Sequence, residues 1–196
     1  MPYFIAGLGN PGEEYKDTRH NTGRIVAEFI ATKNNFSDFK EDLKTKSLLS
    51  KGEIKGEKIT IVNPNNFMNR SGASLAPYIT SLKKAQNLIV IYDDLDLPLG
   101  TIKISYNRSS GGHRGVESII KALKTEEFMR IRVGISPVTP AGKLKKPKGE
   151  TGVENHIIGP FKKPELETIH EVAKMVLDAI ETIISEGKNM AMTKFN

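Results

Sequence analysis

The chain contains 196 residues, 38% hydrophobic and 27% charged, and its formal net charge is +6 at pH 7. That length suits one domain with a sizeable core, and the positive excess favours a polyanionic partner. The chain lacks cysteine, which excludes disulfides, thiolate catalysis and cysteine-ligated zinc. Because no apolar run approaches a bilayer span and the first residues lack the basic flank of a signal peptide, we expect a cytoplasmic protein without a membrane partner.

The first apolar run, residues 3–6, predicts a short buried strand that ends in a glycine-rich loop. Residues 7–12, GLGNPG, match the glycine spacing of a dinucleotide-binding fingerprint. In such a site the third glycine opens a helix whose N-terminal amides bind a pyrophosphate, whereas Glu13 and Glu14 here place carboxylates at that position. The apolar helical pattern also starts only near Ile25. A nucleotide-binding enzyme is therefore the less favoured alternative.

The remaining chain alternates between helical and strand patterns. In chain order we expect a helix at residues 23–34, a hairpin of strands at 47–51 and 58–62, a helix at 73–84, strands at 88–92 and 101–106, a helix at 116–124, a strand at 128–135 and a helix at 164–186. Residues 35–42 and the C-terminal tail are expected to be polar connections, and residues 138–151 a flexible flap rich in proline, glycine and lysine. We therefore predict one α/β domain over residues 1–196, a three-layer sandwich whose mostly parallel, twisted mixed sheet carries helices on both faces.

Three unusual polar segments follow predicted strands. A loop of more than ten residues carries Asn10 and His20, the segment after residues 58–62 carries Asn69, and Asp93 follows residues 88–92. Long loops inside compact domains are usually functional or disordered. Because sites in open α/β sheets form outside the carboxyl ends of strands, we expect these side chains to converge on one pocket.

Such a set of side chains suits hydrolysis by an activated water. A neutral His20 can take a proton from water, while Asp93 on its other ring nitrogen fixes the tautomer and stabilises the imidazolium. Asparagine amides can hold a carbonyl oxygen. The chain has no Gly-x-Ser-x-Gly elbow for a serine nucleophile, and its histidines lack the spacing of a metal site. These histidines are His20, His113, His156 and His170. We therefore expect neither a metal nor a cofactor.

Each candidate also has a purely structural alternative, which the sequence leaves open. His20 is equally well interpreted as a solvated loop residue, and Asp93 more readily as a cap of the turn that follows it. Asn69 could cap the next helix. The glycines at residues 111–112 could serve only a tight turn, and the flap lysines could be no more than a solvated surface.

Five motifs occur along the chain in order. They are GLGNPG at 7–12 with Tyr15 and TRHN at 18–21, FMNRSG at 67–72, DDLDLP at 93–98, GGHRG at 111–115 and RIRVGI at 130–135. With these motifs the chain resembles the bacterial-type peptidyl-tRNA hydrolases along nearly its whole length. The resemblance implies cleavage of the ester that joins a peptide to the 3′-terminal ribose of tRNA, with recognition of the acceptor stem and 3′ end. We expect a monomer.

The resemblance also implies roles for individual residues. His20 takes the general-base position, and Asp93 the position that holds and polarises it. Asn10 falls where the family recognises a blocked α-amine and so distinguishes peptidyl-tRNA from aminoacyl-tRNA. Substrate-binding positions are matched by Tyr15, Phe67 and Asn69, of which the last is also placed to hold water or a carbonyl. Phosphate contacts to the acceptor stem are expected from Lys103 and Arg132.

Two positions depart from the family pattern. Arg114 stands where bacterial members usually have asparagine, so one substrate contact of the pattern is not carried over. A guanidinium there can bind a tRNA phosphate or pair with an acid such as Glu117. Thr193 replaces an asparagine of the usual C-terminal motif, a change we regard as unimportant. A non-catalytic RNA-binding relative is the other alternative, against which the retained His20 and Asp93 argue.

Overall fold

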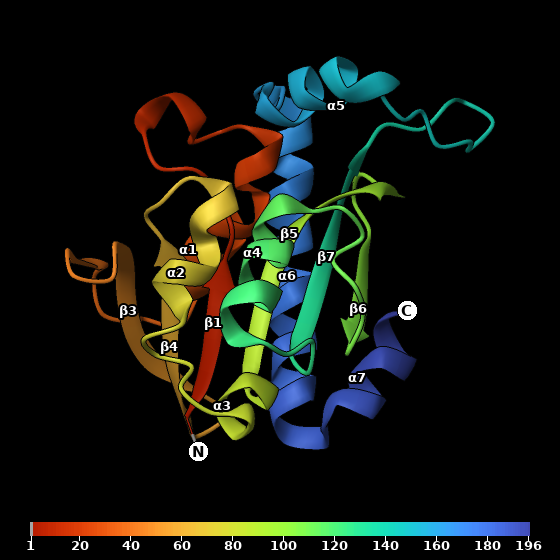
Figure 1. The fold of residues 1–196 in the computed structure, drawn as a ribbon. Helices are drawn as coiled ribbons and strands as arrows, with labels where there is room; N and C mark the ends of the chain where they lie inside the picture. Colours follow the sequence, from red (N-terminus) through yellow and green to blue (C-terminus); the bar gives the residue numbers. More distant parts are fainter. Residues whose placement is uncertain (1) are drawn as a thin grey trace.

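The computed structural model describes residues 2–196 as three layers, in which a seven-stranded sheet lies between two layers of helices (Figure 1). The strands are β1 (Tyr3–Gly7), β2 (Lys40–Asp42), β3 (Ser47–Ile54), β4 (Glu57–Pro64), β5 (Leu88–Pro98), β6 (Ile102–Tyr106) and β7 (Met129–Ser136). Across the sheet they lie in the order β2-β3-β4-β1-β5-β7-β6. The central strands β4, β1, β5 and β7 run parallel, and the outer strands pair antiparallel. The predicted α/β class is confirmed.

Helices cover both faces of the sheet. One face carries α1 (Thr22–Lys33), α6 (Lys163–Glu186) and α7 (Lys188–Phe195), and the other carries α2 (Ser71–Leu75), α3 (Leu82–Gln86) and α4 (Arg114–Leu123) (Figure 1). In β5, Ile89 and Ile91 belong to the core beneath α1 and α6. Leu88, Val90 and Tyr92 belong to the core beneath α2 and α4. This strand is buried on both faces, which explains its continuous apolar run.

The single helix predicted at residues 73–84 is wrong, because two short helices, α2 and α3, occupy that region. Pro77 lies just beyond α2 and has no N–H with which to continue the helical hydrogen-bond ladder. The next helix starts at Ser81, whose hydroxyl accepts a hydrogen bond from the Lys84 N–H. Leu82, whose spacing suggested the buried side of one long helix, is 49% exposed.

Three further elements lie where polar connections were predicted. Helix α5 (Gly149–Ile158) begins inside the predicted flap, α7 occupies the predicted tail, and β2 lies within residues 35–42. No residue of α5 is buried. Such a helix does not need the apolar stripe of a core-facing helix, which is the pattern that predicts a helix from sequence. Helix α7 is fastened to β6 by the Asn196 amide, which donates to and accepts from the Ile104 backbone. That the rest of the flap is flexible stays a prediction.

The predicted hairpin is confirmed, with longer strands and a shorter turn. Strands β3 and β4 pair antiparallel up to Ile54 and Glu57. Lys55 and Gly56 between them have positive φ angles of 50° and 78°. Two consecutive positive φ values are typical of a type I′ turn, whose twist matches that of the flanking strands.

Close glycine contacts set α1 against the centre of the sheet. A Cβ added at Gly7 would lie 2.4 Å from the carbonyl oxygen of Gly23, so the helix packs directly on the strand backbone. Two short 3₁₀ helices, η1 (Glu13–Tyr15) and η2 (Arg19–Asn21), precede α1. A dinucleotide-binding site needs an α-helix directly after the third glycine, so this arrangement argues against that alternative.

Among residues 2–196, no helix has the length and apolar character needed to cross a membrane.

Candidate active site

A cleft of about 840 Å³ opens at the carboxyl ends of β1 and β5. Its walls come from the loop after β1, the loop after β4, the end of β5, the glycine-rich loop before α4, and α5. Six of the predicted site residues line it: Asn10, His20, Phe67, Asn69, Asp93 and Arg114. The expected convergence of the three polar segments is confirmed.

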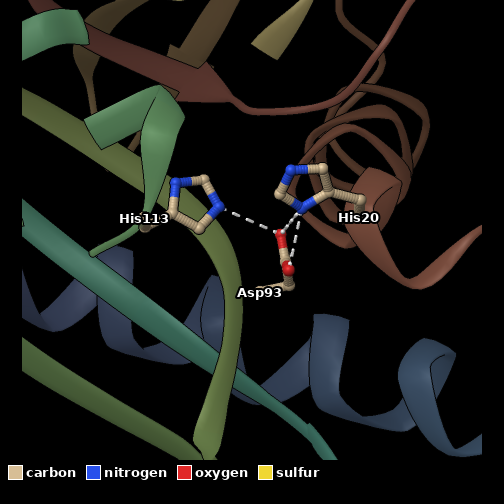
Figure 2. Close-up of side chains that lie close together, drawn as sticks. All are labelled: His20, Asp93 and His113. Atoms are coloured by element: carbon tan, nitrogen blue, oxygen red, sulfur yellow. Dashed lines mark hydrogen bonds and ion pairs between the residues drawn. The ribbon is translucent and has the colours of Figure 1, made fainter. Parts of the chain in front are cut away.

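His20 and Asp93 form a buried pair in this cleft. The Nδ1 atom of His20 lies 3.0 Å from each carboxylate oxygen of Asp93 (Figure 2). The two residues are only 8% and 4% exposed, which excludes the solvated-loop interpretation of His20 and the simple turn cap at Asp93. Because a carboxylate only accepts hydrogen bonds, Nδ1 carries the proton and Nε2 of the neutral ring keeps its lone pair. Nε2 lies on the side of the ring away from Asp93 (Figure 2).

Arg19, directly before this histidine, anchors η2 to the start of α6. Its Nη2 donates to both carboxylate oxygens of Glu165, at 3.1 and 2.9 Å, and its Nη1 donates to the carbonyls of Gly159 and Pro160. Burial would raise the pKa of Glu165, but hydrogen bonds from the Lys162 backbone and from Arg19 hold it below its ordinary value. The general-base candidate therefore follows a residue that fixes the start of its short helix.

Electrostatics in the cleft keep Asp93 ionised. Burial would raise the pKa of Asp93, but attraction to His20 and hydrogen bonding to His113 hold it well below its ordinary value. Burial lowers the pKa of His20, Asp93 raises it and the charge of Arg114 lowers it, with a net rise above the ordinary value. Burial raises the pKa of the Tyr92 hydroxyl to about 12, so this cleft residue stays protonated at neutral pH.

His113 is a site residue that the sequence interpretation did not single out. It caps α4, its Nδ1 accepts a hydrogen bond from the Val116 N–H at 3.3 Å, and its Nε2 lies 3.2 Å from Asp93 Oδ1 (Figure 2). Since Nδ1 accepts, Nε2 carries the proton and donates it to the carboxylate. Gly111 and Gly112, with φ angles of 62° and 85°, form the turn that leads to His113. The sequence signal for the role of His113 was a histidine at the N-cap position of a helix.

The same three residues form a group that could hold a metal ion. One ligand atom each from His20, Asp93 and His113 lies within 4.8 Å of the others. Spacing along the chain did not reveal this group because its members come from three distant segments. In the hydrogen-bond arrangement above, both histidine nitrogens that face Asp93 carry protons. A metal would have to displace these protons, and it would also reverse the tautomer that caps α4.

Asn10 is held so that one side of its amide faces the cleft. Its side-chain oxygen accepts a hydrogen bond from the Met68 N–H at 2.8 Å. Its backbone N–H and carbonyl pair with the side-chain amide of Asn21, at 2.8 and 3.0 Å. The amide oxygen is thus occupied by the opposite wall of the cleft, and the Nδ2 donor is left for a bound molecule.

Phe67 and Asn69 project from the loop after β4. Phe67 is 59% exposed on the cleft wall, so its ring is accessible to a bound molecule. Asn69 lies in the 3₁₀ helix η3 (Met68–Arg70) and is exposed. Helix α2, which follows, has no side-chain hydrogen bond at its N-cap, so the capping interpretation of Asn69 is wrong.

Arg114 lies at the mouth of the cleft, where its Nη2 is 3.4 Å from Glu150 Oε1 in α5. Both side chains are exposed. The acid suggested by the sequence, Glu117, pairs instead with Lys121 at 3.0 Å. Arg114 thus pairs with an acid, as the structural alternative expected, but with Glu150 and not with Glu117. Its contact with substrate stays a prediction.

The structure does not bring Tyr15, Lys103 and Arg132 to the wall of the cleft. Tyr15 ends η1 and is half-buried. Lys103 is exposed on β6, opposite Arg132 on β7, so the two cations share one face of the sheet edge. Arg132 Nε donates to Asp94 Oδ2 at 2.5 Å, and Asp94 does line the cleft.

Known proteins share this sequence and this fold. The family model described as peptidyl-tRNA hydrolase matches residues 4–196. Proteins of that name from Thermoanaerobacter sp. (strain X514) and Carboxydothermus hydrogenoformans are 44% and 41% identical over 195 residues, which cover 99% of this chain and 99% and 98% of theirs. The crystal structure of peptidyl-tRNA hydrolase from Acinetobacter baumannii superposes with a TM-score of 0.87 at 28% identity, over 100% of this chain and 94% of that one. This chain belongs to the peptidyl-tRNA hydrolase family.

Proposed function

We propose that this protein hydrolyses peptidyl-tRNA. It cleaves the ester between the peptide and the 3′-terminal ribose, and it releases free tRNA and free peptide. The observation that carries the proposal is the buried pair of His20 and Asp93, which leaves Nε2 of the histidine unprotonated beside a cleft. Membership of the family supplies the substrate class.

The geometry supports attack by a water molecule. His20 Nε2 takes a proton from water as the water oxygen attacks the ester carbonyl carbon, and Asp93 stabilises the imidazolium that forms. The tetrahedral intermediate then expels the ribose oxygen, which receives the proton from His20. His113 holds Asp93 from its other side, so the carboxylate keeps its orientation throughout. We assign to the exposed amide of Asn69, which lines the same cleft, the role of holding the water or the carbonyl oxygen.

Asn10 gives the protein its preference for substrates whose α-amine is blocked by a peptide or acyl group. Because its oxygen is occupied by Met68, its Nδ2 can donate to the carbonyl of the peptide group that blocks the α-amine. An aminoacyl-tRNA has no such carbonyl, so the donor loses a partner on that substrate. An unpaired polar group costs about 1–3 kcal/mol, which is enough for a marked preference.

Substrate binding outside the reaction centre combines apolar and basic groups. Phe67 offers a ring face to the substrate on the cleft wall, and Tyr15 lies in the same loop as Asn10. Lys103 and Arg132 at the sheet edge are the proposed contacts to acceptor-stem phosphates. Arg132 also donates a hydrogen bond to Asp94 through its Nε atom. We further propose that the protein acts as a cytoplasmic monomer without a metal or cofactor.

The test is a comparison of two substrates. Wild-type protein should release tRNA from N-acetyl-aminoacyl-tRNA and should leave unblocked aminoacyl-tRNA largely intact. A folded His20→Ala variant should still bind tRNA but release little product. Tight binding of tRNA without any release by the wild type would favour the non-catalytic RNA-binding alternative instead.

A further inference from the structure

A guanidinium outside the cleft joins two of its walls. Arg24, in the first turn of α1, donates from Nη1 to the carbonyl oxygen of Asn10 at 3.1 Å. Its Nη2 donates to the carbonyl of Pro64 and to Oδ1 of Asn65, each at 3.1 Å. Its own backbone N–H donates to the Leu8 carbonyl at 3.1 Å. Its side chain therefore ties the loop after β1 to the end of β4 and to the loop after β4, and its backbone N–H adds a bond to the residue that follows β1.

The loop after β4 forms the wall opposite Asn10. Its residues 67–70 line the cleft, and the Met68 N–H holds the side-chain oxygen of Asn10. Arg24 and Met68 thus fix the two ends of the same residue, Arg24 at the main chain and Met68 at the side chain. A shift of either loop would move the Nδ2 donor of Asn10 away from its position in the cleft.

We propose that Arg24 is a positioning residue that sets the preference for blocked substrates by fixing Asn10 against residues 64–69. The proposal rests on the discriminating role proposed for Asn10. Arg24 is absent from the cleft wall, so it acts through Asn10 and does not contact substrate. Its acceptors are neutral oxygens, two carbonyls and one amide, and the planar fork of arginine can serve all three at once. The Nε atom is buried without a partner, a cost consistent with a group retained for its position.

The experiment compares kcat and KM for N-acetyl-aminoacyl-tRNA and unblocked aminoacyl-tRNA. Arg24→Lys keeps the charge but loses the fork, and Asn65→Ala removes a single acceptor. We expect the ratio of kcat/KM between the two substrates to fall about tenfold in Arg24→Lys, below the ~10²-fold that a 1 Å misplacement can cost. Asn65→Ala should give a smaller fall in the same direction. Lys33→Ala, at the exposed end of the same helix, is the control and should leave the ratio unchanged.

A double variant separates positioning from a general structural effect. In an Asn10→Ala background, Arg24→Lys should cause no further fall in the ratio, because the donor that it positions is gone. The proposal would be overturned if Arg24→Lys lowered the ratio further in the Asn10→Ala background, or if Arg24→Lys alone lowered kcat/KM equally for both substrates. If Asn10→Ala itself leaves the ratio unchanged, the discriminating role of Asn10 fails and Arg24 has nothing to position. A ratio narrowed by Asn10→Ala but unchanged in Arg24→Lys and Asn65→Ala would refute the role of Arg24 alone.

Discussion

Gly23 and Ile91 meet so closely that a Cβ on the glycine would lie 2.1 Å from the carbonyl oxygen of the isoleucine. Gly23 belongs to the first turn of α1, directly after the short helix that carries His20. Ile91 lies two residues before Asp93 on β5. The spacing between the proposed base and its carboxylate therefore depends on the absence of a side chain at Gly23.

Gly23→Ala should lower both thermal stability and turnover. The atom that the new methyl group meets is a backbone oxygen in a central strand, which cannot move aside as a flexible side chain can. Overpacking of this kind typically costs about 1–3 kcal/mol, and the accompanying shift of α1 should loosen the contact between His20 and Asp93. Gly152→Ala in α5 is the control, because its nearest neighbour would be 3.9 Å away. Equal melting temperatures for the two variants would contradict the argument.

His20→Ala should lower kcat by the factor that general-base catalysis supplies, about 10²–10⁴. Asp93→Asn should lose less, because the imidazole stays in place and only its orientation and charge stabilisation suffer. Single-turnover assays on N-acetyl-aminoacyl-tRNA measure the chemical step, and tRNA binding should be retained in both variants. Wild-type turnover by a folded His20→Ala protein would rule out this histidine as the base.

Activity should rise with pH as His20 loses its proton. The neutral ring is the active form, and Asp93 raises the pKa of His20 above its ordinary value, so the acid limb should lie above the pH expected for an isolated histidine. In Asp93→Asn the attraction is lost, while burial and the charge of Arg114 still lower this pKa. The acid limb of kcat/KM should therefore move to lower pH in this variant. An unchanged midpoint would mean that another group titrates.

The main features of the fold and of the pair of His20 and Asp93 were predictable because they depend on local patterns and on one topological rule. Apolar runs marked the strands, and polar residues after them marked the edge where parallel strands end. His113, Arg19 and Arg24 were not predictable as site residues. Their roles are set by partners distant in the sequence, and a cation or histidine in a loop or first helical turn is usually solvated.

Helix α5 shows a different reason for failure. Its apolar residues Val153, Ile157 and Ile158 line the cleft, and none of its residues is buried in the core. Hydrophobic periodicity detects helices that pack on a core, so a helix that forms one wall of an open cleft gives little signal. Because the segment before α5 is rich in proline and glycine, the sequence suggested a loop where the helix begins.

Removal of metals should leave turnover unchanged. The group formed by His20, Asp93 and His113 is compact enough for an ion, but its hydrogen bonds require protons on both nitrogens that face the carboxylate. Extensive treatment with EDTA, followed by Mg²⁺ restored only to fold the tRNA, is the measurement. Added Zn²⁺ should inhibit if it binds there, because it would displace the Nδ1 proton of His20. Activity that returned only with a transition metal would overturn the proposed water activation.

Arg114→Ala should raise KM for full-length peptidyl-tRNA if this guanidinium binds a phosphate. Its position at the mouth of the cleft favours contact with the nucleic acid over contact with the ester. Each lost phosphate contact should reduce the slope of log binding constant against log salt concentration by roughly 0.7–0.9 in magnitude. At a pH well above the acid limb, a short mimic carrying only the terminal adenosine ester should be hydrolysed as before. Because the charge of Arg114 lowers the pKa of His20, the acid limb should also move to higher pH.

Glu150→Ala is the matched control, since it removes the acid that faces Arg114 and leaves the guanidinium in place. If phosphate and Glu150 compete for Arg114, this variant should bind full-length tRNA at least as well as the wild type and keep its salt slope. Equal losses on mimic and full-length substrate in Arg114→Ala would place the guanidinium at the reaction centre. If Arg114→Ala affected neither substrate, the contact of Arg114 with Glu150 would be its only role. Loss of that contact should change stability little, because exposed ion pairs contribute little to it.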